Sequence, residues 1–175
     1  QKVTELVNEV EIIIVILGND EALKTLYETE NGLKNCNLKN KTIIEMSTTS
    51  VNYMKKLSNV VLNQNGSFIE CPVGGSTKPA RDGQLLGLMG GNENKINSLD
   101  FLFKDLFRRY EYLGEIGKGT AMKLAINLPL LVYWQSLGEA LKLTNQNGIE
   151  FEKALDILID TSGACKVAHL KTGTI

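Results

Sequence analysis

The stretch Glu11-Ile12-Ile13-Ile14-Val15-Ile16-Leu17 decides the fold class of this chain. It is a continuous β-branched run without polar alternation, which is typical of a parallel strand covered on both faces. Gly18-Asn19-Asp20 follows and predicts the start of a helix, because short polar side chains commonly cap the first helical amides. A buried strand that leads directly into a helix is the repeating unit of a parallel α/β sheet.

The same strand-helix unit recurs along the chain. The spacing of the apolar residues and the positions of glycine, proline and capping residues predict an open α/β sheet, followed by helices alone. Ser47-Thr48-Thr49-Ser50 is expected to cap the helix that follows it, and Asn147-Gly148 to end the longest predicted helix. Pro129 lies inside that longest helix and is expected to kink it. The predicted helices span about 3–10, 21–30, 50–64, 92–107, 120–145 and 151–160, and the strands 11–17, 41–47, 67–73, 85–89 and 109–113.

Three strand ends are candidates for a ligand site. In open α/β sheets, ligands bind beyond the carboxyl ends of the strands. Those ends are Leu17-Gly18, Ser47-Thr48 and Val73-Gly74-Gly75, and they carry small or hydroxyl residues. This composition is what a crevice lined by a cofactor requires.

Composition excludes several classes of function. The 175 residues are 43% hydrophobic and 22% charged, with a formal net charge of −1, which gives no argument for a nucleic acid or membrane partner. Cys36, Cys71 and Cys165 lack metal spacing and indicate a reducing, cytoplasmic setting. Nothing around the single histidine, His169, suggests a catalytic triad. The apolar run Leu128–Trp134 is far shorter than the ~20 residues of a membrane span.

A glycine turn followed by a helix carries the first candidate chemistry. The stretch Gly117-Lys118-Gly119-Thr120-Ala121-Met122-Lys123-Leu124-Ala125-Ile126-Asn127 places Lys123 and Asn127 four residues apart, and hence on one helix face. A lysine on an apolar helix either extends its amine to water or is held for chemistry. On this stretch alone, the first interpretation is favoured.

A glycine pair after a predicted strand is the second candidate. It lies in Glu70-Cys71-Pro72-Val73-Gly74-Gly75-Ser76-Thr77-Lys78-Pro79-Ala80-Arg81-Asp82-Gly83-Gln84-Leu85. Consecutive free backbone amides at Gly74 and Gly75 can receive a carboxylate. The alternative is a plain glycine turn.

Together the two stretches resemble the β-hydroxyacid dehydrogenase family, which includes 3-hydroxyisobutyrate dehydrogenases and glyoxylate/succinic semialdehyde reductases. That family carries a D-x-P-V-S-G-G-x-x-x-A-x-x-G-x-L element and a G-x-G-x-x-x-K-x-x-N element. The pairs Ser47-Thr48 and Glu139-Ala140 also fall where the family has them. The resemblance covers essentially the whole chain.

The resemblance implies an oxidoreductase that transfers a hydride between NAD or NADP and a small carboxylated aldehyde or ketone, or its 2- or 3-hydroxy acid. Lys123 resembles the general acid and base. Asn127 resembles the residue that holds substrate and lysine, and Gly74 and Gly75 match the element that receives the substrate carboxylate.

The cofactor residues follow from the same resemblance. Thr48 matches the residue that contacts the nicotinamide ribose, and Leu17 and Gly18 occupy the strand end over which the dinucleotide passes. The family also implies a homo-oligomer, a dimer or tetramer. No metal is implied.

The chain departs from the family pattern at three places. Gly74 replaces the family serine and Ser76 the second family glycine, so the substrate is left open. The opening G-x-G-x-x-G unit and the final helices of the family are absent, so the resemblance implies a fragment of a longer enzyme. It implies a partial Rossmann-type dinucleotide-binding domain over 1–116. Over 117–175 it implies the interdomain helix and the start of an all-α substrate and dimerisation domain like that of 6-phosphogluconate dehydrogenase.

Two consequences of that interpretation stay open. A non-catalytic binding or dimerisation module of the same fold is the alternative function. As a fragment, the chain is expected to bind no dinucleotide detectably and not to be a well-behaved monomer, because its apolar strand 11–17 would form a bare sheet edge.

Overall fold

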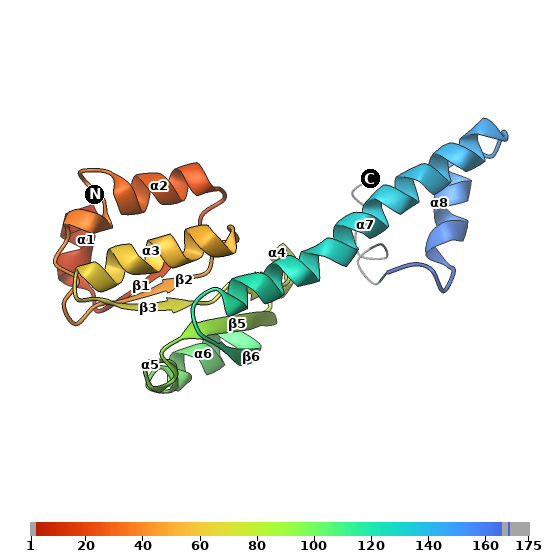
Figure 1. Ribbon diagram of the computed structural model, residues 1–175. Helices are drawn as coiled ribbons and strands as arrows, with labels where there is room; N and C mark the ends of the chain where they lie inside the picture. The colour runs from red at the N-terminus through yellow and green to blue at the C-terminus, as the bar shows by residue number, and fades with distance from the viewer. Residues whose placement is uncertain (1–2, 166–167, 169–175) are drawn as a thin grey trace. The chain divides into compact units, whose positions relative to one another are not determined.

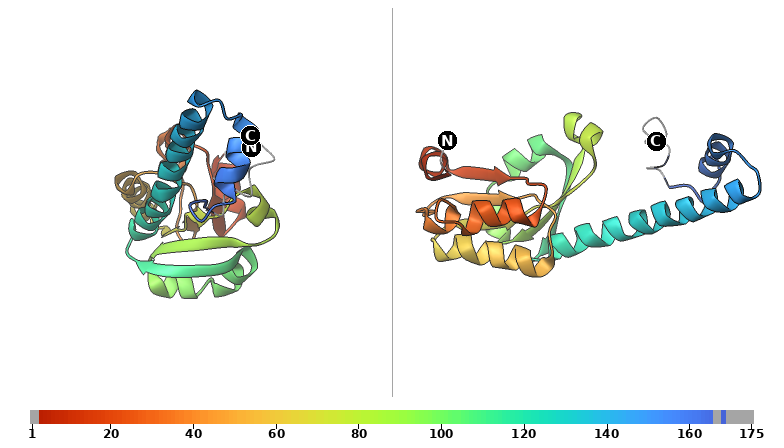
Figure 2. Two further views of the ribbon diagram at one scale, coloured as in Figure 1. Left: turned by 90° about the vertical axis from the view of Figure 1, so that its right-hand side faces the viewer. Right: turned by 90° about the horizontal axis from the view of Figure 1, so that it is seen from above.

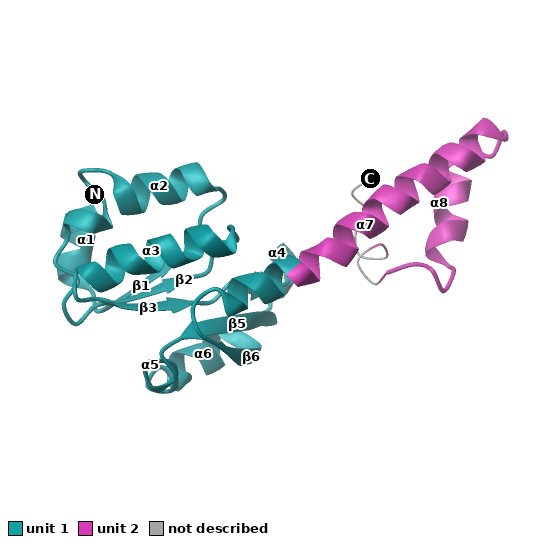
Figure 3. Ribbon diagram, in the orientation of Figure 1, with its two compact units in different colours: residues 1–124 teal, residues 125–175 magenta. Residues whose placement is uncertain are grey.

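The computed structural model describes residues 3–165 and 168. The chain divides into two compact units, residues 1–124 and 125–175 (Figure 3). The first unit contains a six-stranded sheet (Figure 1). Its strands are β1 (Ile12–Val15), β2 (Thr42–Glu45), β3 (Ser67–Glu70), β4 (Val73–Gly74), β5 (Leu85–Gly91) and β6 (Phe107–Gly114).

The sheet is parallel in its first half and mixed in its second. Strands β1, β2 and β3 are parallel and in register, so that Ile13 lies beside Ile43 and Ile43 beside Phe68. Strand β5 runs antiparallel to β3 and β4 and parallel to β6. The parallel crossovers expected for the first three strands are confirmed, whereas β5 reverses direction. Only the short helix α4 (Thr77–Arg81) separates β4 from β5, and a parallel crossover needs a dozen or more residues.

The helices largely follow the predicted order. The first unit contains α1 (Val3–Glu9), α2 (Asp20–Glu28), the 3₁₀ turn η1 (Leu33–Asn35), α3 (Val51–Asn63), α4, α5 (Glu93–Asn97), α6 (Asp100–Leu106) and the start of α7 (Lys118–Gln146). The predicted caps are confirmed: Asn19 Oδ1 accepts from the Ala22 amide at 2.8 Å, and Ser50 Oγ accepts from that of Tyr53 at 3.2 Å. The single helix predicted over 92–107 is instead two helices, α5 and α6.

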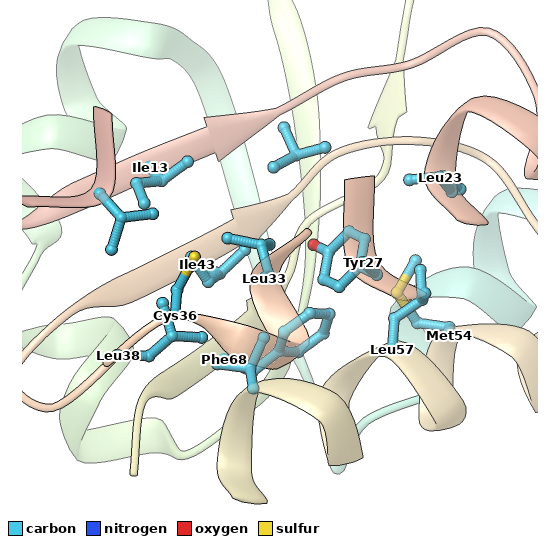
Figure 4. Close-up of a cluster of buried hydrophobic side chains, with 13 residues drawn as sticks. Ile13, Leu23, Tyr27, Leu33, Cys36, Leu38, Ile43, Met54, Leu57 and Phe68 are labelled. Carbon is cyan, nitrogen blue, oxygen red and sulfur yellow. The ribbon is translucent and has the colours of Figure 1, made fainter. Parts of the chain in front are cut away.

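Helices cover both faces of the sheet (Figures 1 and 2). On one face, Ile13, Ile43 and Phe68 pack with residues of α2 and α3, as the close-up in Figure 4 shows. On the other face, Ile44 and Ile69 pack with residues of α5 and α6. Alternate residues of β2 and β3 therefore serve two cores, one on each face of the sheet.

Strand β1 is covered fully on one face and only at Ile12 on the other. Ile13 and Val15 are buried, whereas Ile14 is 42% and Ile16 61% exposed. Within the described residues β1 pairs only with β2, so its other edge is open. The expectation of cover on both faces was wrong for this strand, because the helices of the second face lie under later strands.

The second unit is helical. Helix α7 continues through Pro129 without interruption and is followed by α8 (Phe151–Ile159). The predicted glycine terminus is confirmed: Gly148 has φ +79°, and the Ile149 amide donates to the Thr144 carbonyl at 3.1 Å. The expected kink at Pro129 stays a prediction.

Candidate functional site

The predicted cofactor residues meet at the carboxyl ends of β1 and β2. The Leu17 amide donates to Ser47 Oγ at 2.8 Å, which joins the two strand ends. Gly18 and Thr48 are both exposed beside this link. The Thr49 hydroxyl donates to Asp20 Oδ1 at 2.5 Å and connects the starts of the two following helices. The sheet thus presents Leu17, Gly18 and Thr48 along one edge.

Gly18 has no structural reason to be glycine. A Cβ atom built there would meet nothing within 4 Å, and φ lies outside the left-handed region. Bare backbone at the carboxyl end of a parallel strand suits the close approach of a dinucleotide. The residues at this edge therefore fit the cofactor that the fold implies.

The glycine pair Gly74-Gly75 differs from Gly18, because the fold requires one of its two glycines. Gly74 is in β4, and a Cβ there would make an ordinary contact of 3.5 Å with Leu86, so a serine side chain fits. Gly75 has φ +131°, and a Cβ there would lie 2.7 Å from Leu85 Cδ2. Within residues 3–165 and 168, the amides of Gly75 and Ser76 donate no hydrogen bond. The turn is therefore required by the fold and also offers amides to an anion.

Lys123 is half-buried on α7. Burial lowers the pKa of its ammonium group below the ordinary value of 10.5. No hydrogen bond or ion pair to Lys123 is found among the described residues. Asn127 follows one turn later on the same helix, but it falls in the second compact unit, whereas Lys123 falls in the first. An unpaired amine with a lowered pKa is suited to proton transfer.

Sequence reasoning missed two buried glutamates. Glu45 and Glu70 end β2 and β3, are paired in register and are both fully buried. Glu45 accepts from the Tyr27 hydroxyl at 2.7 Å and the Ser47 amide at 2.8 Å, and its burial raises the pKa of its carboxyl group. A signal was present in the sequence, since two apolar strands each end in a glutamate.

Glu70 binds the start of α7. Its Oε1 accepts from the amides of Gly117 and Gly119, each at 2.7 Å, and its Oε2 accepts from the Thr120 hydroxyl at 2.7 Å. The helix that carries Lys123 is thereby fixed to the end of β3.

Other kinds of site are not found in the described part of the chain. No helix there is long and apolar enough to cross a membrane. In the same residues, no group of three or more His, Cys, Asp or Glu side chains is arranged to hold a metal ion. His169 lies outside the described residues.

Relatives span more than this chain. The chain is 30% identical over 154 residues to glyoxylate/succinic semialdehyde reductase 1 of Arabidopsis thaliana, covering 88% of this chain and 53% of that protein. It is 26% identical over 154 residues to the human cytokine-like nuclear factor N-PAC, covering 88% of this chain and 28% of that protein. The chain therefore spans about half, or less, of the length of these relatives.

A solved structure agrees in fold. The 3-hydroxyisobutyrate dehydrogenase of Salmonella typhimurium superposes with a TM-score of 0.84 at 16% identity, covering 97% of this chain and 59% of that one. Residues 1–114 match the family described as the NAD binding domain of 6-phosphogluconate dehydrogenase. That match covers most of the chain and the whole sheet, and so the chain belongs to this family.

Proposed function

We propose that this protein is an oxidoreductase that transfers a hydride between NAD or NADP and a small carboxylated aldehyde or ketone, or the matching 2- or 3-hydroxy acid. The observation that carries the proposal is Lys123, a half-buried amine without a partner among the described residues and with a lowered pKa. The first substrates to test are glyoxylate and succinic semialdehyde, which the name of the Arabidopsis relative gives.

Different residues would bind the cofactor and the substrate. Leu17, Gly18 and Thr48 would hold the dinucleotide along the strand ends, and the bound nicotinamide supplies or accepts the hydride. The amides of the Gly74-Gly75 turn would receive the substrate carboxylate. Gly74 leaves that turn without the family hydroxyl, and Ser76 provides one two residues later.

Lys123 would move the proton. In reduction, its ammonium group donates a proton to the carbonyl oxygen as negative charge develops there, and in oxidation the neutral amine takes the proton from the alcohol. Burial assists both directions, because it brings the pKa of the ammonium group closer to neutral pH. Asn127, one turn along the helix, would hold the substrate oxygen near the amine.

The test is a matched pair of lysine variants of the protein at its natural length. Lys123→Met should lower kcat for a carboxylated aldehyde by about 10²–10⁴-fold, the usual contribution of a general acid. Lys142→Met removes an exposed lysine of the same helix and should leave kcat unchanged. Turnover by Lys123→Met within about threefold of wild type would rule out the assignment.

The alternative is a non-catalytic binding or dimerisation module. The similarity to N-PAC, whose name is not that of an enzyme, favours it. The two functions differ at Lys123, because a binding module has no need for an unpaired amine on an apolar helix. Dinucleotide binding with no turnover in any carboxylated aldehyde or hydroxy acid would support the module.

The proposal includes self-association as a homo-oligomer, a dimer or tetramer. Helix α7 exposes Leu128, Leu131 and Val132 by 60% or more each. Apolar side chains gathered on one helix in this way favour contact with another protein surface.

A further inference from the structure

The buried carboxylate of Glu70 is enclosed by glycine backbone. A Cβ on Gly90 would lie 2.3 Å from Glu70 Oε1, and a Cβ on Gly119 would lie 2.3 Å from the Leu88 carbonyl oxygen and 3.2 Å from Glu70 Oε1. The carboxylate therefore fills the space between β5 and the first turn of α7. No side chain larger than hydrogen fits at Gly90 without displacing it, and at Gly119 the Leu88 carbonyl leaves no room for one.

The carboxylate satisfies groups that a helix cannot satisfy itself. The first amides of a helix have no partner within it, and the helix dipole leaves positive charge there. Glu70 accepts two of these amides and the Thr120 hydroxyl, from 47 to 50 residues earlier in the sequence. A single side chain thus determines where α7 begins and how it is rotated.

Lys123 lies on the helix face that Glu70 binds. It follows Gly119 by four residues and Thr120 by three, and residues at these spacings share a face. A small rotation of the first turn would therefore change the position of the Lys123 amine. Displacements of about 1 Å at a reacting group can cost about 10²-fold in rate.

We propose that Glu70 is a positioning residue for Lys123, because it fixes the first turn of α7 to the end of β3. The inference rests on the proposed role of Lys123. If Glu70 had only a structural role, its loss would affect the fold as a whole. As a positioning residue, its loss should change the environment of the Lys123 amine more than it changes the fold.

The neighbouring strand offers a matched control. Glu45 is paired in register with Glu70 and is equally buried, yet its partners are Tyr27 and Ser47, and neither belongs to α7. Glu45→Gln therefore perturbs a buried carboxyl on the same face of the sheet while leaving the start of α7 in place.

The first readout is spectroscopic and needs no turnover. In Glu70→Ala, the amide proton resonances of Gly117 and Gly119 should move upfield, since both lose their hydrogen-bond acceptor. Reductive methylation of Lys123, followed by mass spectrometry, should become faster by about threefold or more as the first turn frays. Glu45→Gln should change neither. Equal labelling of Lys123 in Glu70→Ala and Glu45→Gln would overturn the inference.

The second readout is kinetic and uses the conservative variants. Glu70→Ala should lower kcat by about 10–100-fold with little change in the KM of the cofactor. Glu70→Gln keeps the length and one acceptor oxygen and should recover most of kcat. If Glu70→Ala does not fold, Glu70→Asp replaces it, because its carboxylate stops one methylene short of the two amides and should give the same labelling change.

The two proposals fail in different ways. A wild-type protein without turnover would overturn the oxidoreductase, and the labelling of Lys123 would then decide the role of Glu70 alone. Normal turnover in Glu70→Ala, with Lys123→Met inactive, would overturn the positioning role and leave the function intact.

Discussion

Two glycines of the candidate site, Gly18 and Gly75, are glycine for different physical reasons. At Gly75 the backbone has φ +131° and a Cβ would collide with Leu85, so the fold itself requires glycine. At Gly18 neither constraint exists. A glycine that the fold does not need is the better indicator of ligand approach.

This difference predicts separable effects on stability and binding. Gly18→Val should change the free energy of unfolding by less than about 0.5 kcal/mol, as exposed substitutions usually do. It should lower dinucleotide affinity by about tenfold or more, because a branched side chain blocks the approach of the cofactor to the backbone. Calorimetric titration with NADH and NADPH of the protein at its natural length, beside thermal melting, measures both.

The control for this experiment is Gly138→Val. A Cβ at Gly138 also meets nothing within 4 Å, but this glycine lies inside α7. Its substitution should leave dinucleotide affinity unchanged. Unchanged affinity in Gly18→Val as well would remove Gly18 from the cofactor site.

Glu45 predicts a pH dependence of stability. Burial raises the pKa of its carboxyl group above the ordinary 4.5, so the folded state retains the proton that the unfolded state loses. This contribution to stability is complete below pH 4.5 and is lost as the pH rises through the raised pKa. Glu45→Gln has no such proton, and the stability of wild type relative to the variant should fall between pH 4.5 and neutral pH.

A second glutamate, Glu28, should contribute a pH dependence of stability with the opposite sign. The hydrogen bond from Lys56 lowers the pKa of the Glu28 carboxyl group, with a further contribution from Tyr53. Its contribution to stability is present above pH 4.5 and is lost as the pH falls through the lowered pKa. In denaturant unfolding, the stability of wild type relative to Glu28→Gln should rise as the pH approaches 4.5 from below, whereas its stability relative to Glu45→Gln should fall as the pH rises above 4.5.

At the scale of elements, β1 combines an open edge with an exposed apolar face. Ile14 and Ile16 point away from the core that Ile13 and Val15 enter. Unpaired strand edges with apolar side chains associate with other chains unless a charge interrupts them.

Ile14→Lys should therefore reduce self-association of this chain through β1. The added ammonium group reaches water from an exposed position, so the fold should be retained. Light scattering as a function of concentration measures the effect. Asn59→Lys adds the same charge at an exposed site on α3 and separates edge pairing from net charge. Equal scattering of the two variants would exclude the β1 edge as the contact.

Local sequence signals predicted where helices begin and end better than they predicted how the strands pair. The caps at Asn19 and Ser50 and the glycine terminus at Gly148 were predictable, because each depends on one residue and its near neighbours. The antiparallel β5 and the open face of β1 were not, because strand direction and cover depend on partners far along the chain. The same holds for Glu70, whose partners lie 47 to 50 residues away.

At the scale of the whole molecule, burial is unequal between the two units. The first unit has a buried core on each face of its sheet. Among the described residues of the second, only Leu137, Ala154 and Ala168 are buried apolar residues. Few buried contacts mean low local stability.

Hydrogen exchange should therefore separate the units. Amides of β2, β3 and α3 should exchange slowest, whereas those of α7 beyond residue 125 and of α8 should exchange about 10³-fold faster or more, since their opening is not opposed by a core. Mass spectrometry of peptides from timed exchange gives both rates in one experiment. Comparable protection of the two units would mean that a partner or a second copy covers α7.

The enclosure of Glu70 predicts which positions change together among related sequences. The carboxylate, the hydrogen-sized gap at Gly90 and the two amide donors Gly117 and Gly119 come from three separate segments, and each fits only because the others are present. A change at one position leaves a clash or an unpaired buried group at another. Positions 70 and 90 should therefore vary together among relatives, so that a lineage which loses the acid at position 70 also relaxes its glycine at 90.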